Sequence, residues 1–516
     1  MSRTGRDRLV LAVDLGSGGP KVGYVTLAGE PVWTWYERGD AVGGAETQDA
    51  GAWWRTIVSA ARLGTAEGHV DGADVVGVAV TGQWASTVPV DAAGVPVAEC
   101  LMWSDTRGAA YSRERFGGPV SGYAPTVLAT WLRRSGGVPS PGGADPVAHL
   151  LHLQHDRPEV LEQARWCLEP VDYLTMRFTG RATATAMSMT AAWLTDNRDL
   201  DTLAYDPVLL RIAGVDPARL PPLVRGGSVV GTVLPDVAAE IGISADAQVV
   251  TGAPDLHNAV IASGCVDLHQ THLSLGTSAW ISCPVPSKKT DVFRQLAAVP
   301  GIGDGHYVLA DNQDNAGRCL EWFRASFAPD LEYDDLAALA ASAPPGAGGV
   351  FFTPWLSGER SPVDARWARG GFHNLSLAAD RAALARAVME GVALNLRWLL
   401  EAAEHFTGRR MDPIRLVGGG ATMDVWCQIL ADTLDRTLER VEQPWMGGLR
   451  GGGLTVGLAL GEIARDEVHG LVPVERVFTP DPGLRSTYDA MSVEFRKLFK
   501  GQRGMFRRLN TDETAP

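Results

Sequence analysis

The segment QVVTGAPDLHNAVIASGCVDLHQTHLSLGTSAWISC, residues 248–283, predicts two strands joined through a short helix. Asp255 follows the first strand and its Gly-Ala-Pro turn, at the start of an apolar helical run. Asp is favoured there because its carboxylate accepts hydrogen bonds from unpaired backbone N–H groups. The second strand enters the turn Gly276-Thr277-Ser278, which offers the N–H and hydroxyl donors that a chain of phosphates needs. Taken alone, the segment is better explained by a helix cap and a hairpin.

Length and composition narrow the class of protein. A chain of 516 residues is too long for one core of usual size, so two large domains are expected. The hydrophobic share of 45% and the charged share of 21% suit a soluble globular enzyme. A net charge of −14 argues against nucleic acid or an anionic membrane as the main partner. An anionic substrate therefore needs local donors or a metal ion.

The cysteine pattern and the apolar runs indicate a cytoplasmic protein. The 6 cysteines are scattered and show no CxxC pairing, which favours reduced thiols over a disulfide framework or a zinc site. The apolar run that follows Arg8 ends at Asp14, which is too short for a secretory signal. No stretch reaches the ~18 consecutive apolar residues of a membrane span.

A second phosphate-shaped turn is predicted near the N-terminus. Residues 9–13 form a continuous apolar run, typical of a strand buried on both faces, and a further strand is expected at 22–27. The small residues between them and Lys21 make a hairpin suited to holding phosphates, although the spacing is not that of a Walker motif. Asp14 at the strand end is a candidate for holding Mg²⁺ through water. A lone strand-end Asp is more often a turn former, so this role needs neighbouring evidence.

Polar and aromatic residues at two further strand ends indicate a polyol site. The apolar strand 74–81 is followed by Gln83, Trp84 and Ala85, and the short piece 100–107 contains Asp105. An amide and a carboxylate can bind hydroxyl groups, while an indole face covers the C–H side of a sugar. Taken alone, Trp84 is better explained as a core aromatic.

The second half of the chain repeats this logic. A strand at 414–417 runs into three glycines, 418–420, and a helix follows at 426–434, which is a place where backbone approaches a ligand closely. A long amphipathic helix is expected at 381–405, and a basic helix at 488–509 is expected to cover the second domain. Two halves that each open with strand, small-residue turn and strand predict a duplicated fold, with a phosphate-bearing ligand between the two turns.

The ordered set of motifs resembles the FGGY carbohydrate kinases, most closely the pentulose kinases such as xylulokinase. The motifs are DLGSGGPK, the strand ending TGQ, LMWSDTR, PVDYL, the Asp255 segment, LSLGTS, NAGRCLEWF, FFTPWLSGERSP followed by ARGGF, and LVGGGATMDVWCQILAD. They run in the family's order over residues 9–462, nearly the whole chain. Each motif is weak by itself, and the ordered set is strong.

The resemblance implies an α/β fold of two actin-like (ribonuclease H-like) domains with an interdomain cleft that closes on ATP and a sugar. It implies an N-terminal domain at 1–266 for the sugar and the catalytic base, a nucleotide-binding domain at 267–465 and a helical tail at 466–516. Asp255 is expected as the base, and Asp14 and Asp255 as the metal site for Mg²⁺. Gln83, Trp84, Ala85 and Asp105 are expected at the sugar. The residues expected at ATP are Ser17, Gly18, Lys21, Gly276, Thr277, Gly317, Gly420, Ala421 and Asp424.

This sequence departs from the family pattern at the sugar. Xylulokinases usually read Gln-Met-His-Gly where this chain has Gln83-Trp84-Ala85-Ser86, and Asp-Asn-Ala-Ala where it has Asp255-Leu256-His257-Asn258. Pro20 also lies in the first phosphate turn. The resemblance therefore implies a kinase more firmly than it implies xylulose, and His257 is expected to be structural.

Two alternatives stay open at this point. One alternative is a kinase of ribulose, a tetrulose, glycerol or another polyol, since such kinases differ only in the pocket. The altered positions also allow a catalytically silent, nucleotide-dependent sugar sensor, although a sensor has no need of the retained Asp255. A homodimer is a further expectation for the assembly.

Overall fold

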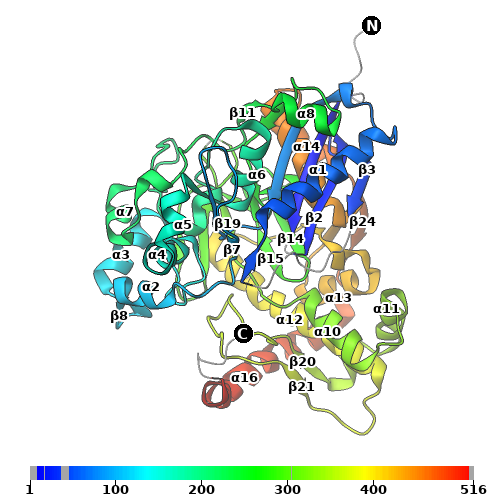
Figure 1. Ribbon diagram of the computed structural model, residues 1–516. Coiled ribbons are helices and arrows are strands. Elements are labelled where there is room, and N and C mark those ends of the chain that lie inside the picture. Colours follow the sequence, from blue (N-terminus) through cyan, green and yellow to red (C-terminus); the bar gives the residue numbers. More distant parts are fainter. Residues whose placement is uncertain (1–7, 17, 37–45, 304, 511–516) are drawn as a thin grey trace.

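The computed structural model describes residues 8–16, 18–36, 46–303 and 305–510. In these residues the chain forms two large mixed sheets with helices packed on them, and a lobe of short helices stands beside the first sheet (Figure 1). Within the described part of the chain, no helix combines the length and the apolar character needed to cross a membrane.

The first sheet is organised around β1, Leu9–Gly16. Antiparallel β2, Gly19–Thr26, lies on one side of β1, and parallel β5, Val75–Gly82, lies on the other. The strand order is β11-β12-β5-β1-β2-β3, with β13 beside the end of β5. The remaining strands are β3 (Pro31–Tyr36), β11 (Val229–Thr232), β12 (Gln248–Val250) and β13 (Ala253–Pro254).

Both faces of the first sheet are buried, as the continuous apolar run of β1 predicted. Leu11 and Val13 belong to a core shared with α1, α6 and α8, whereas Val10 and Ala12 lie on the opposite face against α14. Because side chains alternate along a strand, an unbroken apolar run is needed to serve two cores. The helices are α1 (Ala50–Ala66), α6 (Pro170–Thr179), α8 (Pro235–Ile241) and α14 (Gly447–Ala459).

The second sheet repeats this plan. Its order is β15-β14-β22-β23-β24, in which β15 is antiparallel to β14 while β22 and β23 continue parallel. The first sheet has the same sequence of pairings in β2, β1, β5 and β12. The strands are β14 (Thr271–Leu275), β15 (Ala279–Ser282), β22 (Ile414–Val417), β23 (Leu438–Val441) and β24 (Val474–Phe478). The repeat agrees with the predicted duplication.

One face of the second sheet carries the largest core of the molecule, under α10, α11, α12 and α13. These helices are α10 (Gly317–Phe327), α11 (Tyr333–Ser342), α12 (Arg381–Thr407) and α13 (Asp424–Leu434). The other face meets α9 (Asp255–Ala262), α14 and α15 (Val468–Leu471). Leu449 and Val456 of α14 belong to the core on the first sheet, whereas Leu454 belongs to the core on the second. Thus α14 is shared by both sheets.

Smaller elements surround this frame. The lobe on the left of Figure 1 is built from α2 (Ala109–Phe116), α3 (Pro125–Arg134), α4 (Pro146–Asp156), α5 (Pro158–Gln163) and α7 (Pro207–Ala213). A four-stranded sheet joins β16 (Pro284–Val285), β19 (Tyr307–Ala310), β18 (Leu296–Pro300) and β17 (Thr290–Asp291). Short strand pairs are β4 (Thr47–Gln48) with β7 (Cys100–Leu101), β6 (Val88–Val90) with β10 (Trp166–Leu168), β8 (Gly117–Gly118) with β9 (Gly122–Tyr123), and β20 (Phe351–Thr353) with β21 (Gly371–His373).

The C-terminal segment is more than the helical tail that the sequence suggested. Its strand β24 completes the second sheet by pairing antiparallel with β23. The final helix α16, Arg485–Leu509, buries Tyr488, Phe495 and Phe499 against Trp355 and neighbouring apolar side chains. The spacing of these residues places them on one face of a helix. The basic helix therefore covers the second half of the molecule with its apolar face, as expected.

Candidate functional site

The register of the first sheet brings the predicted catalytic side chains to one edge. Asp14 on β1 pairs with Lys21 on β2 and with Thr81 on β5. On the far side of β5, Thr81 pairs with Ala253 and Gly82 pairs with Pro254, the residue before Asp255. Lys21, Asp14 and Asp255, which are far apart in sequence, thus lie along one end of the sheet.

Asp255 is a buried carboxylate set at the start of α9. The sequence placed it as a helix cap, whereas the structure makes it the first helical residue, preceded by Pro254 as the capping position. Its Oδ1 accepts the N–H of Leu256 at 2.7 Å. Burial and, to a smaller extent, the negative charge of Asp14 together raise the pKa of Asp255 to about 7, against the hydrogen bond from the Leu256 N–H. A carboxylate that titrates near neutral pH is well matched to accept a proton from a hydroxyl group.

Asp14 is the second carboxylate of this edge. Burial raises its pKa, and the positive charge of Lys21 opposes that shift. Helix α14 comes close to it: a Cβ added at Gly448 would lie 2.1 Å from Asp14 Oδ2, so only glycine fits there. Two carboxylates that repel each other fit a divalent cation, which would relieve the repulsion.

The donor set also suits magnesium. In the described residues no three His, Cys, Asp or Glu side chains gather as a closed metal cage. Mg²⁺ does not need such a cage, because it usually keeps several waters and takes one or two carboxylates together with substrate phosphates. Asp14 and Asp255 are thus the residues of this edge that fit the ion.

The first phosphate turn is a tight hairpin. Gly16 pairs with Gly19 across it, and Lys21 stands on β2 with its Nζ 5.5 Å from the centre of the Tyr36 ring. Gly18 lies in the turn, and the predicted contact Ser17 lies outside the described residues. Lys21 therefore places its charge beside Asp14 and the turn, as the point-charge role requires.

The second phosphate turn is closed by α10. The Gly317 N–H donates to Gly276 O at 2.8 Å, and the Ala316 N–H donates to Thr277 O at 2.9 Å. A Cβ at Gly317 would lie 2.6 Å from Gly276 O, so the helix start needs glycine to approach the turn. Thr277 itself is exposed and available to a ligand. The structure thus joins Gly276, Thr277 and Gly317, which the sequence had placed together at ATP.

The triple-glycine turn packs on the same strand end. Gly418 has a positive φ of 100°, and a Cβ on it would lie 2.5 Å from Leu275 O, directly before Gly276. Gly420 also lies against Leu275, and Ala421 follows it in the short helix η6, Gly419–Thr422. Three of the predicted nucleotide segments therefore meet at the end of β14.

Asp424 is the nucleotide candidate whose carboxylate is already engaged. Its Oδ1 accepts Arg440 Nη1 at 2.6 Å, and its Oδ2 pairs with Arg476. The pair of arginines compensates its charge. Asp424 begins α13 directly after the glycine turn, and through these arginines its side chain holds β23 and β24.

The residues predicted to bind the sugar come directly after β5, at the same edge of the sheet. Gln83 is buried, and neither polar atom of its side chain has a hydrogen-bond partner in the described part of the protein. Such a group suits a ligand that brings its own hydroxyls. Trp84 meets the ring of His257 edge-on with centroids 6.2 Å apart, and Ala85 adopts a positive φ of 60°. The structure thus brings Gln83, Trp84 and Ala85 to the helix of Asp255.

Asp105 and His257 have structural partners. Arg107 donates to Asp105 through its backbone N–H at 2.9 Å and through its guanidinium, and this pairing lowers the pKa of the carboxyl against the effect of burial. Ser86 Oγ accepts the Trp103 N–H at 3.0 Å, so the loop before Asp105 lies beside residues 83–86, which we call the sugar loop. His257 Nε2 lies 2.7 Å from Pro300 O, and burial lowers its pKa to about 4. This agrees with the structural role expected for His257.

Glu169 is a site residue that the sequence reasoning missed. It is buried under the sugar loop, and its Oε2 accepts the N–H of Ser86 at 3.1 Å. Burial raises its pKa far above the usual range, and its neighbour Asp172 adds to that shift while the backbone of Ser86 and Ala85 opposes it. An acidic residue directly before a buried apolar helix was the available signal, within the stretch that precedes PVDYL.

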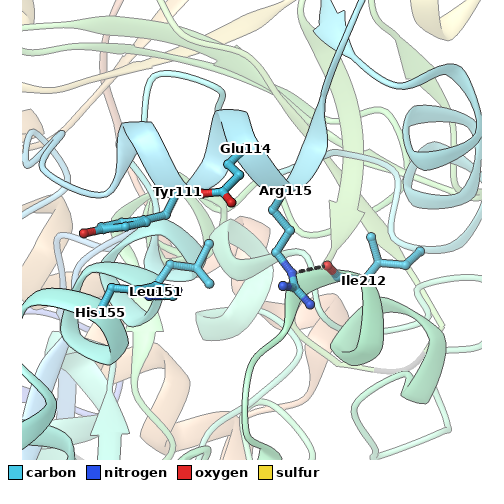
Figure 2. Close-up of a pocket in the computed structure, with 6 residues that line it drawn as sticks. All are labelled: Tyr111, Glu114, Arg115, Leu151, His155 and Ile212. Atoms are coloured by element: carbon cyan, nitrogen blue, oxygen red, sulfur yellow. Dashed lines mark hydrogen bonds between the residues drawn. The ribbon is translucent and has the colours of Figure 1, made fainter.

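A separate cavity of about 440 Å³ lies on the helical lobe (Figure 2). Arg115 Nε donates to Ile212 O at 2.6 Å, and Tyr111 stacks on His155 with centroids 4.5 Å apart. Tyr111 also donates its hydroxyl to Asp156 at 2.5 Å. The main polar groups of this cavity serve the packing of α2, α4 and α7, and none of its lining residues was predicted for the site.

Comparison with known proteins matches two family descriptions in order. Residues 34–262 match the N-terminal domain of the FGGY family of carbohydrate kinases, and residues 272–454 match its C-terminal domain. Xylulose kinase of Escherichia coli (strain K12) is 29% identical over 528 residues, covering 95% of this chain and 99% of the relative. A gluconokinase of Bacillus licheniformis is 26% identical over 377 residues, covering 68% of each chain.

A solved structure shares the whole fold. The ligand-bound xylulose kinase from Lactobacillus acidophilus superposes with a TM-score of 0.84 at 21% identity, covering 97% of this chain and 100% of the other. The predicted fold class, two actin-like (ribonuclease H-like) domains, is confirmed. The enzyme class is confirmed as well, a xylulokinase-like carbohydrate kinase whose substrates are a sugar and ATP. The chain belongs to the FGGY family of carbohydrate kinases.

Proposed function

We propose that this kinase transfers the γ-phosphate of Mg-ATP to a hydroxyl of a ketopentose such as xylulose, with Asp255 as the general base. The observation that carries the proposal is the edge shared by Asp14, Lys21, Gln83 and Asp255. The names of the similar kinases support xylulose first, and gluconate is the competing acceptor.

The proposed division of work follows the domain limits expected above, with the sugar and base in 1–266 and ATP in 267–465. Asp255 accepts a hydrogen bond from the attacking hydroxyl and takes its proton late in the transfer. Lys21, the first turn and Gly276 with Thr277 hold the phosphates by charge and backbone N–H groups. Gly317, Gly420, Ala421 and the start of α13 at Asp424 form the nucleotide wall.

The proposal also assigns the groups that offset the phosphate charge, bind the sugar and exclude water. Asp14 and Asp255 would hold Mg²⁺, which would supply positive charge to offset the negative charge of the β- and γ-phosphates. Gln83 binds hydroxyls of the sugar, Trp84 covers its C–H side, and Ala85 leaves room beside them. Asp105 is held by Arg107 on its own loop, which meets the loop of these residues where the Trp103 N–H donates to Ser86 Oγ. Closure of the two halves excludes water, whose attack would waste ATP.

The test is a coupled ADP-release assay with Mg-ATP against ketopentoses, aldopentoses, gluconate, glycerol and other polyols. Wild type and Asp255→Asn are assayed in parallel, and the phosphorylated product is identified by mass spectrometry. The expected result is Asp255-dependent turnover with xylulose at the highest kcat/KM. A different preferred acceptor would replace xylulose while leaving the base intact. ATP binding without any phosphorylated product would instead favour the sugar sensor.

The proposal also covers the oligomeric state of the protein and its cellular compartment. We expect a cytoplasmic homodimer, consistent with the acidic chain and with the absence of a membrane-spanning helix from the described residues. Size-exclusion chromatography with light scattering measures the assembly, and a mass of one chain would contradict the dimer.

A further inference from the structure

Asn258 lies on α9 three residues after Asp255, close to one helical turn. It is 3% exposed. Its Nδ2 donates to Gly447 O at 3.2 Å and to Gly448 O at 3.0 Å. The amide therefore ties the helix of the proposed base to the first two residues of α14, across more than 180 residues of sequence.

Helix α14 is shaped to receive this amide. A Cβ on Gly451 would lie 2.3 Å from Asn258 Oδ1, so any side chain there would displace the asparagine. Gly448, which accepts the hydrogen bond, is also the residue that fits against Asp14 Oδ2. One turn of α14 thus contacts both Asp14 and the helix of Asp255.

The same turn is attached to the nucleotide wall. Pro444, in the short helix η7 (Pro444–Met446) that leads into α14, accepts the Gly418 N–H at 2.8 Å. Arg450 Nη2 donates to Glu442 O at 2.6 Å and fixes the segment before it. A continuous series of contacts therefore runs from Gly418 through Pro444 and Gly448 to Asn258.

We propose that Asn258 is a positioning residue for phosphoryl transfer: its amide couples occupancy of the nucleotide turn to the placement of Asp255. The inference rests on the proposed function, since it takes Asp255 as the base. ATP that settles against Gly418 fixes the start of α14, and α14 fixes α9 through the two hydrogen bonds of Asn258. The sugar then meets a base that is already in place.

The test measures coupling between the two ligands. The dissociation constant of the preferred sugar is determined by calorimetry with and without Mg²⁺ and a non-hydrolysable ATP analogue. We expect wild type to bind the sugar at least about 5-fold more tightly with the nucleotide. In Asn258→Ala this ratio falls below about 2 and kcat falls, while the dissociation constant of the sugar without nucleotide changes little. A merely structural role would lower the melting temperature and leave the ratio unchanged.

A second variant reaches the same contact from the other helix. Gly451→Ala leaves the amide in the chain and pushes it from its site, so it reproduces the loss of coupling. Because both changes break one contact, the double variant shows little further loss, whereas independent effects would add. If Asn258→Ala does not fold, Gly451→Ala decides the question alone.

The matched control is Asn197→Ala, which removes another buried amide. Asn197 is 1% exposed and its Nδ2 donates to Ser135 O at 2.8 Å, in the helical lobe. It should lose stability and keep the coupling ratio. Asn258→Ala that is folded, turns over sugar and keeps the wild-type ratio overturns the inference, as does a wild-type ratio below about 2. Failure of the wild type to phosphorylate any sugar would overturn the proposed function instead.

Discussion

The two halves of the site present different chemical groups at equivalent positions: charged side chains in the first half and backbone in the second. After β1 the first half presents charged side chains, with Asp14, Lys21 and Asp255 on one edge. After β14 the second half presents backbone, with Gly317 and Gly418 packed so closely on the turn that a Cβ would overlap a carbonyl oxygen. In the proposed function, the same hairpin and parallel-strand plan serves proton transfer and charge in one half, and a close-fitting wall for the nucleotide in the other.

The largest effect is expected in the charged half. Asp255→Asn removes the proton acceptor and keeps the shape, so kcat should fall at least ~10²-fold while ATP binding is roughly kept. Steady-state kinetics and calorimetry with ATP measure the two quantities. Near-normal turnover in this variant would show that the first half does not act through its carboxylate.

A smaller and different effect is expected in the backbone half. Gly317→Ala places a Cβ 2.6 Å from Gly276 O, so the turn must shift, and overpacking of this kind costs about 1–3 kcal/mol. We expect KM for ATP to rise about 10-fold while the dissociation constant of the sugar is unchanged. Gly501→Ala, on α16 where a Cβ meets open space, is the matched control. An equal loss of affinity for ATP and for the sugar would contradict the expectation that the second half binds only the nucleotide.

Glu169→Leu tests whether the sugar loop depends on a buried acceptor. The Ser86 N–H would lose its partner, which costs about 1–3 kcal/mol when the donor stays buried. We expect KM for the sugar to rise ~5-fold with KM for ATP unchanged. Glu169→Gln, which retains an acceptor oxygen, should stay near wild type. An effect of the same size in both variants would mean that the charge of Glu169, and not its hydrogen bond, matters.

The last effect concerns stability and not activity. Burial raises the pKa of Asp311 to about 8, and its Oδ1 accepts the N–H of Ile281 at 3.0 Å. The folded state therefore keeps a proton that the unfolded chain releases near pH 4, so the stabilising contribution of Asp311 is complete below that pH and declines as the pH rises to about 8. Asp311→Asn has no such loss, so its melting temperature should gain on wild type between pH 5 and about 8. A constant difference across this range would contradict the assignment.

The sequence predicted those parts of this molecule that depend on local pattern and ordered motifs. The apolar run of β1, the small-residue turns and the position of Asp255 are all readable along the chain. The pairing of Asp14 with Lys21 and Thr81 follows from sheet register, which no local pattern specifies. Asn258 and Glu169 contact partners far away in sequence, Gly448 and Ser86. The local sequence therefore does not identify these partners, although an acidic residue before an apolar helix was a signal for Glu169.

Asp424 shows that a motif can single out a residue while the partners of its side chain remain unpredicted. It lies at the start of α13, next to the glycine turn, where motif order predicts a contact with the nucleotide. Its ion pairs with Arg440 and Arg476 depend on β23 and β24 meeting in the second sheet, and β24 comes from the segment expected to be a helical tail. A motif thus locates a backbone position better than it locates the partner of a side chain.

Because α14 contributes to the cores on both sheets, we expect that neither half of this enzyme folds by itself. A polypeptide ending at residue 266 would leave Val10, Ala12 and Val25 on an uncovered apolar face. Such a fragment should aggregate when expressed alone, and it should be rescued in trans by a second fragment carrying residues 267–510. Heat or denaturant should likewise melt the protein in a single transition, since removing one helix strips both sheets together.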